Sequence, residues 1–303
     1  MNPSEIALVR AELAANPRAS EIAQMRSDSD KRGLANPIAP DIVIEPTVAG
    51  GVPAEWTTAP DANRQRAILY FHGGGHVIGS IDSHRHAVAE IGRAAGARTL
   101  ALHFRLAPEH PFPAQIEDAV AAYRYLLEAG FKTENVAFAG DSAGGGLVVA
   151  SMVSARDQGL KLPACGWCIS PWTDMESSGA SHIDKAEEDP MVRPGVSEFM
   201  ARTYLAGADP RHPLASPIHA DLSGLPPLLI QVGAAETLLD DSVRLARVAG
   251  AAHVPVQLEI WPSMVHIWHI FPRLTAARRA IAAGGTFIRS VMDGRPPILA
   301  RQE

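Results

Sequence analysis

A single serine stands among small residues in the stretch AGDSAGGG, residues 139–146. A strand-like apolar run precedes it and a helix-like run begins at Ala143, so Ser142 is predicted to lie on the turn between them. Gly140, Ser142 and Gly144 fill G-x-S-x-G, a sharp turn that exposes a serine hydroxyl where larger neighbours would collide. The stretch predicts a nucleophilic serine. Other motifs are needed to distinguish this prediction from an ordinary glycine-rich loop.

A second glycine-rich stretch, HGGG, follows another strand-like run. Its glycines have no side chains to shield their N–H groups, and bare N–H groups stabilise a developing oxyanion. We expect the N–H groups of Gly73, Gly74 and Ala143 to form an oxyanion hole. A phosphate-binding loop is disfavoured, because neither glycine run is followed by Lys-Ser/Thr.

A base must take the serine proton, and in the order serine, acid, histidine it comes late in the chain. His266 follows the last predicted strand and precedes the last helix, in the kind of loop where such sites assemble. His269 is the nearest alternative, but it falls inside the helical pattern. His76, His84 and His86 belong to the glycine loop and the helix after it, where a core or solvent-facing role is expected.

The histidine needs a carboxylate to fix its tautomer, and Glu236, Asp240 and Asp241 follow the seventh predicted strand. Thr237 and Asp240 have the spacing of a capping box, which gives Asp240 a structural role, and Asp241 then lies in the first helical turn. Glu236 precedes the helix, so it is the predicted acid, with Asp240 as the alternative. Asp141 is excluded because adjacent side chains on the turn diverge.

These motifs lie between alternating elements. Strand-like segments occur near residues 42–45, 54–57, 67–72, 98–103, 135–140, 164–170, 228–232 and 256–261. Helix-like segments occur near residues 83–96, 114–129, 143–157, 238–250 and 270–292. Repeated strand-helix units predict an α/β fold with a mostly parallel sheet of about eight strands, covered by helices on both faces.

Composition narrows the classes of function. The chain has 303 residues, 47% of them hydrophobic, and a net charge of −6 without long runs of one sign. One compact unit is expected, with no nucleic-acid partner. The N-terminus lacks a secretory pattern and no apolar run could span a bilayer, so we expect a cytoplasmic protein without membrane insertion. Cys165 and Cys168 read as part of a buried strand, where they face opposite sides, rather than as a redox pair.

The chain resembles the hormone-sensitive lipase family of α/β-hydrolases through HGGG at 72–75, GDSAG at 140–144 and FRLAPEHPFPA at 104–114. The resemblance covers nearly the whole chain, and His103 departs from it where relatives often carry tyrosine. It implies a carboxylester hydrolase in which the histidine matching His266 is the base. It also implies a helical cap, no metal or cofactor, and a homodimer formed through the sheet edge.

The cap is expected to consist of residues 1–40 and 174–217, which do not fit the alternation, and the catalytic domain of residues 41–173 and 218–303. Surface padding is an equal alternative for the N-terminal helices. With a modest cap, the resemblance predicts short acyl chains and pocket residues Phe199, Met200, Tyr204 and Leu205. Amide hydrolysis, acyl transfer and a non-catalytic binding protein on the same fold stay open as alternatives.

Overall fold

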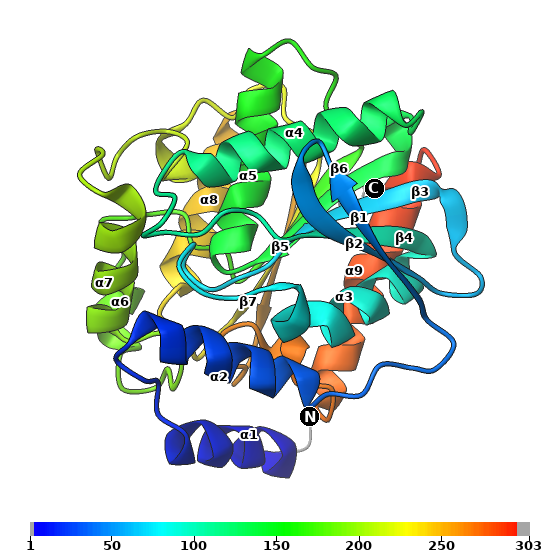
Figure 1. Cartoon of the computed structure of the whole chain (residues 1–303). Coiled ribbons are helices and arrows are strands. Elements are labelled where there is room, and N and C mark those ends of the chain that lie inside the picture. Colours follow the sequence, from blue (N-terminus) through cyan, green and yellow to red (C-terminus); the bar gives the residue numbers. More distant parts are fainter. Residues whose placement is uncertain (1–2, 296–303) are drawn as a thin grey trace, which may run out of the picture.

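The fold is built on one eight-stranded sheet, and the computed structural model describes residues 3–295 (Figure 1). The strand order is β1-β2-β4-β3-β5-β6-β7-β8; β1 pairs antiparallel with β2 and β2 with β4, and all other pairs are parallel. The predicted mostly parallel sheet is therefore confirmed. The strands are β1 Val43–Ala49, β2 Val52–Thr58, β3 Asn63–Phe71, β4 Ala97–Leu102, β5 Val136–Asp141, β6 Cys165–Ile169, β7 Leu228–Gly233 and β8 Val256–Trp261.

Helices cover both faces of the sheet because the inner strands are apolar on both sides. On β3, Ile68 and Tyr70 pack toward α3 and α9, whereas Leu69 and Phe71 pack toward α4, α5 and α8. The helices are α1 Pro3–Ala15, α2 Ile22–Leu34, α3 Ile81–Ala95, α4 Ala114–Glu128, α5 Ala143–Asp157, α6 Ser181–Asp184, α7 Pro194–Leu205, α8 Leu239–Ala251 and α9 Thr275–Met292.

The last helix begins later than the sequence pattern predicts. Residues Trp268–Ile270 form a 3₁₀ turn, and α9 starts at Thr275. Pro272 explains the difference, since the residue before a proline is driven out of the helical region and Phe271 is extended, with φ −100° and ψ 91°.

The carboxyl ends of the parallel strands meet at one edge of the sheet. There β3 leads into the glycine loop, β5 ends at Asp141, and β7 and β8 lead into the loops that carry Glu236 and His266. This topology gathers residues that are far apart in the chain.

The helices α1, α2 and α7 lie over this edge (Figure 1). Met25 of α2 shares an apolar cluster with Met200 and Tyr204 of α7, and Val9 of α1 packs with Trp268. Both segments that interrupt the strand-helix alternation are thus packed near the strand ends. Among residues 3–295, no helix has the length and apolar character needed to cross a membrane.

Candidate active site

Ser142 occupies a strained turn between β5 and α5, with φ 55° and ψ −122°. A non-glycine residue in such a region costs about 1–3 kcal/mol and persists only when its surroundings hold it. Here the Ser142 N–H donates to the carbonyl of Ile169 at 2.8 Å. A Cβ at position 144 would lie 2.0 Å from the Phe71 carbonyl oxygen, so Gly144 allows α5 to approach β3 this closely. The turn exposes the Ser142 side chain to a cavity.

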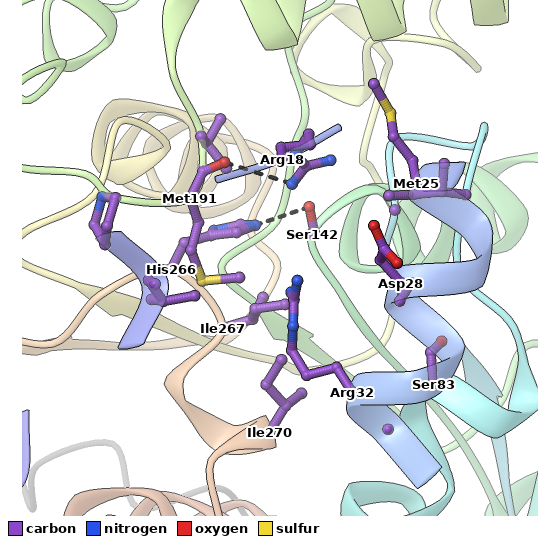
Figure 2. A pocket seen from close by; sticks show the side chains of 18 of the residues that line it. Arg18, Met25, Asp28, Arg32, Ser83, Ser142, Met191, His266, Ile267 and Ile270 are labelled. Carbon is purple, nitrogen blue, oxygen red and sulfur yellow. Dashed lines mark hydrogen bonds between the residues drawn. The ribbon is translucent and has the colours of Figure 1, made fainter. Parts of the chain in front are cut away.

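His266 reaches this serine from the loop after β8. Its Nε2 lies 2.9 Å from Ser142 Oγ, and the imidazole is buried (Figure 2). The next residue, Ile267, has φ 43°, and its N–H donates to Ser170 Oγ at 3.2 Å. The loop is thereby held to the end of β6 while His266 faces the hydroxyl.

Glu236 stands behind the imidazole. Its Oε1 lies 3.3 Å from His266 Nδ1, and its Oε2 accepts hydrogen bonds from Ser170 Oγ at 2.9 Å and Gly233 N–H at 3.2 Å. Burial alone lowers the pKa of His266, but the charge of Glu236 and its hydrogen bond outweigh burial and raise that pKa above its ordinary value. Burial raises the pKa of Glu236, an effect that the charge of His266 opposes. The structure brings Ser142, His266 and Glu236 into one chain of contacts.

The predicted capping box on α8 is wrong. The cap position is Leu238, without a side-chain cap bond. Thr237 instead donates through its N–H to Asp189 Oδ2 at 2.9 Å, and Asp240 Oδ2 accepts from the N–H of Ser181 at 2.9 Å. Both residues bind the 174–217 segment because it folds against the start of α8, a contact that local spacing cannot reveal. Asp240 is engaged with Ser181 and not with His266.

The glycine loop differs from the prediction in one donor. The Gly73 N–H donates to Asp141 Oδ1 at 3.1 Å, so it is already engaged and does not fit an oxyanion hole. Gly74 and Gly75 line the cavity beside Ser142. Within residues 3–295, no protein acceptor binds the N–H groups of Gly74, Gly75 or Ala143. Gly75 therefore replaces Gly73 among the candidate donors.

Asp141 fastens the glycine loop to the serine turn. Besides Gly73, it accepts from Tyr70 Oη at 2.7 Å and His84 Nε2 at 3.2 Å, all buried. Burial raises the pKa of Asp141, but the charge and hydrogen bond of His84 outweigh it, so that pKa lies below its ordinary value. The pKa of His84 is raised, since Asp141 outweighs burial. Sequence reasoning excluded Asp141 as the acid but missed this network, whose only sequence signal is the aspartate beside the serine.

The other histidines near the site have different partners. His269 Nε2 lies 2.8 Å from Gln231 Oε1, and His86 Nδ1 lies 2.6 Å from the Pro37 carbonyl. The His76 ring stacks on Tyr204 with centroids 4.0 Å apart, and burial lowers its pKa to about 3. Among the chain's 12 histidines, all of them described, only His266 is hydrogen-bonded to Ser142.

A cavity of about 420 Å³ opens above Ser142. Of the four predicted pocket residues, Met200 lines it, whereas Phe199, Tyr204 and Leu205 do not. Tyr204 is buried against His76 and Phe112, beneath the cavity wall. Sequence reasoning missed most of the wall, which comes from α1, α2, the segment between them, the loop before α7 and the start of α7. Among its members are Leu13, Arg18, Met25, Arg32, Met191 and Val196.

One group of side chains has metal-binding geometry among the described residues. Ligand atoms of Asp174, Glu176 and His219 lie within 4.8 Å of one another. Asp174 already accepts from Arg244 at 2.7 Å and from Ser178 Oγ at 2.5 Å. None of the three lines the cavity of Ser142, so this group is separate from the candidate site.

Comparison with known proteins finds a matching family and related hydrolases. Residues 68–270 match the family described as alpha/beta hydrolase fold. The chain is 52% identical to an acetyl-hydrolase of Streptomyces hygroscopicus over 80% of this chain and 81% of the relative. It is 35% identical to a carboxylesterase of Mycobacterium tuberculosis over 66% of this chain and 65% of the relative.

Solved structures agree over nearly the full length. An esterase from the bacterial hormone-sensitive lipase family superposes with a TM-score of 0.94 at 47% identity, covering 96% of this chain and 99% of the other. An esterase soaked with p-nitrophenyl butyrate superposes with a TM-score of 0.93 at 49% identity, covering 97% of this chain and 100% of the other.

Proposed function

The chain belongs to the hormone-sensitive lipase family of α/β-hydrolases and is a carboxylester hydrolase, and from this premise we propose that it cleaves short-chain acyl esters with Ser142, His266 and Glu236. The observation that carries the proposal is the continuous contact from Ser142 Oγ to His266 Nε2, at 2.9 Å, and from His266 Nδ1 to Glu236 Oε1, at 3.3 Å. A non-catalytic binding protein would not need this alignment.

In the first half of the proposed reaction, His266 takes the proton of Ser142 as Oγ bonds to the ester carbonyl carbon. Glu236 stabilises the resulting imidazolium. When the tetrahedral intermediate collapses, the bond to the alcohol oxygen breaks and His266 protonates the departing alcohol. In the second half, His266 takes a proton from water, the hydroxide attacks the acyl carbonyl, and the proton returns to Ser142 as the acid leaves.

The oxyanion formed in each half is assigned to the N–H groups of Gly74, Gly75 and Ala143. Hydrogen bonds that are already aimed at a developing charge lower the barrier without reorganisation. Asp141 acts on these donors indirectly, because its bonds to Gly73 and His84 hold the loop that presents Gly74 and Gly75. Gly73 is thus a positioning residue.

The proposed substrate has an acyl chain of roughly two to eight carbons, since a cavity of about 420 Å³ holds a small molecule. The solved esterase soaked with p-nitrophenyl butyrate supports this size class. Residues 1–40 and 174–217 are proposed as the cap, because residues of both segments line the cavity, and residues 41–173 and 218–303 as the catalytic domain. Of these ranges, residues 1–2 and 296–303 lie outside the described residues.

The experiment is a rapid-mixing assay with p-nitrophenyl acetate, butyrate, octanoate and laurate, with intact-mass detection of the acyl-enzyme and peptide mapping of the acylated residue. We expect a burst of p-nitrophenol, acylation at Ser142, and the highest kcat/KM at or below eight carbons. Acylation at another residue contradicts the mechanism. A clear preference for emulsified long-chain triglyceride contradicts the size class.

A further inference from the structure

Two arginines from the N-terminal segment line the cavity that holds Ser142. Arg18 lies between α1 and α2, and Arg32 lies near the end of α2. Figure 2 shows both guanidinium groups directed into the cavity, in the region of Ser142 and His266. Neither residue takes part in the proposed reaction.

Arg18 and Arg32 form no ion pair with an acidic side chain among the described residues, whereas several other arginines do. Arg26, also on α2, pairs with Glu109 at 2.7 Å, and Arg105 pairs with Asp118 at 2.8 Å. Among the described residues, the one hydrogen-bond acceptor of Arg18 is the Met191 carbonyl, at 3.5 Å. Within residues 3–295, the Arg32 guanidinium has no hydrogen bond or ion pair. Two guanidinium groups therefore face the cavity with most of their donors free.

The carboxylates near this part of the cavity are otherwise engaged. Glu12 pairs with Arg273. Asp28 accepts from Gln24 Nε2 at 2.6 Å and lies 3.7 Å from Lys31 Nζ.

Asp189 attracts Arg18, but its oxygens accept from the N–H groups of Met191, Val192 and Thr237. The lining as a whole has three arginines against two carboxylates, although the chain carries a net charge of −6.

The two cations also act on each other. Enclosure of its guanidinium end lowers the pKa of Arg18, and the charge of Arg32 lowers it further, although the residue as a whole keeps contact with solvent. Arginine nevertheless stays protonated at any ordinary pH. An anion between the two guanidinium groups would relieve their repulsion and satisfy their free donors.

We propose that this cavity selects esters bearing an anionic group, such as a carboxylate or phosphate, which Arg18 and Arg32 bind while Ser142 attacks the ester carbonyl. The planar guanidinium fork binds these anions through paired hydrogen bonds, which are stronger than bonds between neutral groups. The inference rests on the proposed function and adds the charge of the substrate to it. The anion belongs to the acyl part or to the alcohol part of the ester, and the experiment distinguishes the two.

The experiment measures kcat/KM for two matched pairs of esters. For an anion in the alcohol part, 4-acetoxybenzoate is compared with methyl 4-acetoxybenzoate. For an anion in the acyl part, mono-4-nitrophenyl glutarate is compared with 4-nitrophenyl pentanoate, after subtraction of spontaneous hydrolysis. The variants are Arg18→Met, Arg32→Met and both together. The matched control is Arg64→Met, an exposed arginine at the opposite end of β3 from the glycine loop.

We expect the ratio of kcat/KM for the anionic ester to that for its neutral partner to fall roughly tenfold in each single variant, about the effect of one charge-assisted hydrogen bond. The change in this ratio is informative because intrinsic reactivity cancels between variants. The ratio should fall further in the double variant, recover in part in Arg18→Lys and Arg32→Lys, and decrease with added salt in the wild type. Arg64→Met should leave it unchanged.

An unchanged ratio in the double variant for both ester pairs overturns the inference, provided that the variants melt as the wild type does. A fall in one pair only identifies the part of the ester that carries the charge. Hydrolysis of the neutral esters reports separately on the proposed function. Wild-type turnover of neutral esters with an unresponsive ratio therefore defeats this inference alone, whereas no turnover of any ester defeats the proposed function.

Discussion

Two buried histidine–carboxylate pairs flank Ser142, and they differ in what lies beyond the imidazole. His266 is 3.3 Å from Glu236, and His84 is 3.2 Å from Asp141. In both pairs the carboxylate outweighs burial and raises the histidine pKa. The carboxylates differ, because burial leaves the pKa of Glu236 raised, whereas the charge and hydrogen bond of His84 leave that of Asp141 lowered.

Their surroundings separate them. The second nitrogen of His266 faces Ser142 Oγ at 2.9 Å, whereas that of His84 faces Ser83 Oγ at 2.7 Å. In the His84 pair it is the carboxylate that reaches toward the site, through the N–H of Gly73. The first pair can move a proton of the nucleophile, while the second can only hold the glycine loop. Residue type alone does not tell the two histidine–carboxylate pairs apart, and geometry assigns their roles.

The largest loss of kcat is expected when Ser142, which only the His266–Glu236 pair contacts, loses its hydroxyl. Ser142→Ala removes the atom that His266 faces, and kcat should fall by roughly 10⁵- to 10⁶-fold, the size of nucleophile losses in other serine hydrolases. The measurement is p-nitrophenyl butyrate hydrolysis, with a thermal melt to show that the variant folds. Near-normal turnover by the folded variant would contradict the assignment of proton transfer from Ser142 to the His266–Glu236 pair.

The next largest effect tests the carboxylate of the first pair. Glu236→Gln keeps the shape but removes the charge behind His266, so kcat should fall by up to roughly 10⁴-fold, as when a triad acid is neutralised. Asp240→Asn is the matched control, because Asp240 binds Ser181 instead. The control should keep its turnover. If the two results are exchanged, the acid is Asp240.

A smaller loss of kcat is expected when the second pair, His84 and Asp141, is disrupted. Asp141→Asn weakens the hold on Gly73 and His84, and the displaced loop should reduce kcat by about 10- to 100-fold. Stopped-flow acylation and a thermal melt separate a misplaced oxyanion hole from loss of folding. A loss as large as that of Ser142→Ala would mean that Asp141 does more than position the loop, and an unchanged kcat would mean that the loop does not depend on it.

The smallest expected effect is a shift in the pH dependence of kcat/KM, which is measured with a neutral ester. Activity requires neutral His266, whose pKa is raised, so the acid limb of the wild type should lie above the ordinary histidine value of about 6.5. Glu236→Gln removes the charge that favours imidazolium, so the limb should move to lower pH.

Asp141 is a minor contributor to the pKa of His266, so Asp141→Asn should shift the acid limb less, in the same direction. Equal shifts in the two variants would contradict the assignment of His266 to Glu236.

Much of the fold could be predicted from the sequence because its signals are local. Alternating apolar runs predicted the sheet, which the structure confirms, and the GDSAG stretch predicted a strand-turn-helix, which is found with Ser142 at φ 55°. Cys165 and Cys168 pack on opposite faces of the sheet, as their spacing in a strand predicts. The strand-turn-helix could be recognised because residues 140 to 144 follow one another in the chain, although their contacts come from elsewhere in the fold.

The sequence by itself determined the element order, the serine turn and the set of residue types available for chemistry. Only the tertiary structure decided that Gly73 binds Asp141, that Thr237 binds Asp189 instead of capping α8, and that Tyr204 faces His76 instead of the cavity. The physical reason is separation along the chain. Gly73 and Asp141 are 68 residues apart and meet because β3 and β5 are neighbours in the sheet. Such contacts depend on how whole elements pack, and a local sequence pattern does not specify that packing.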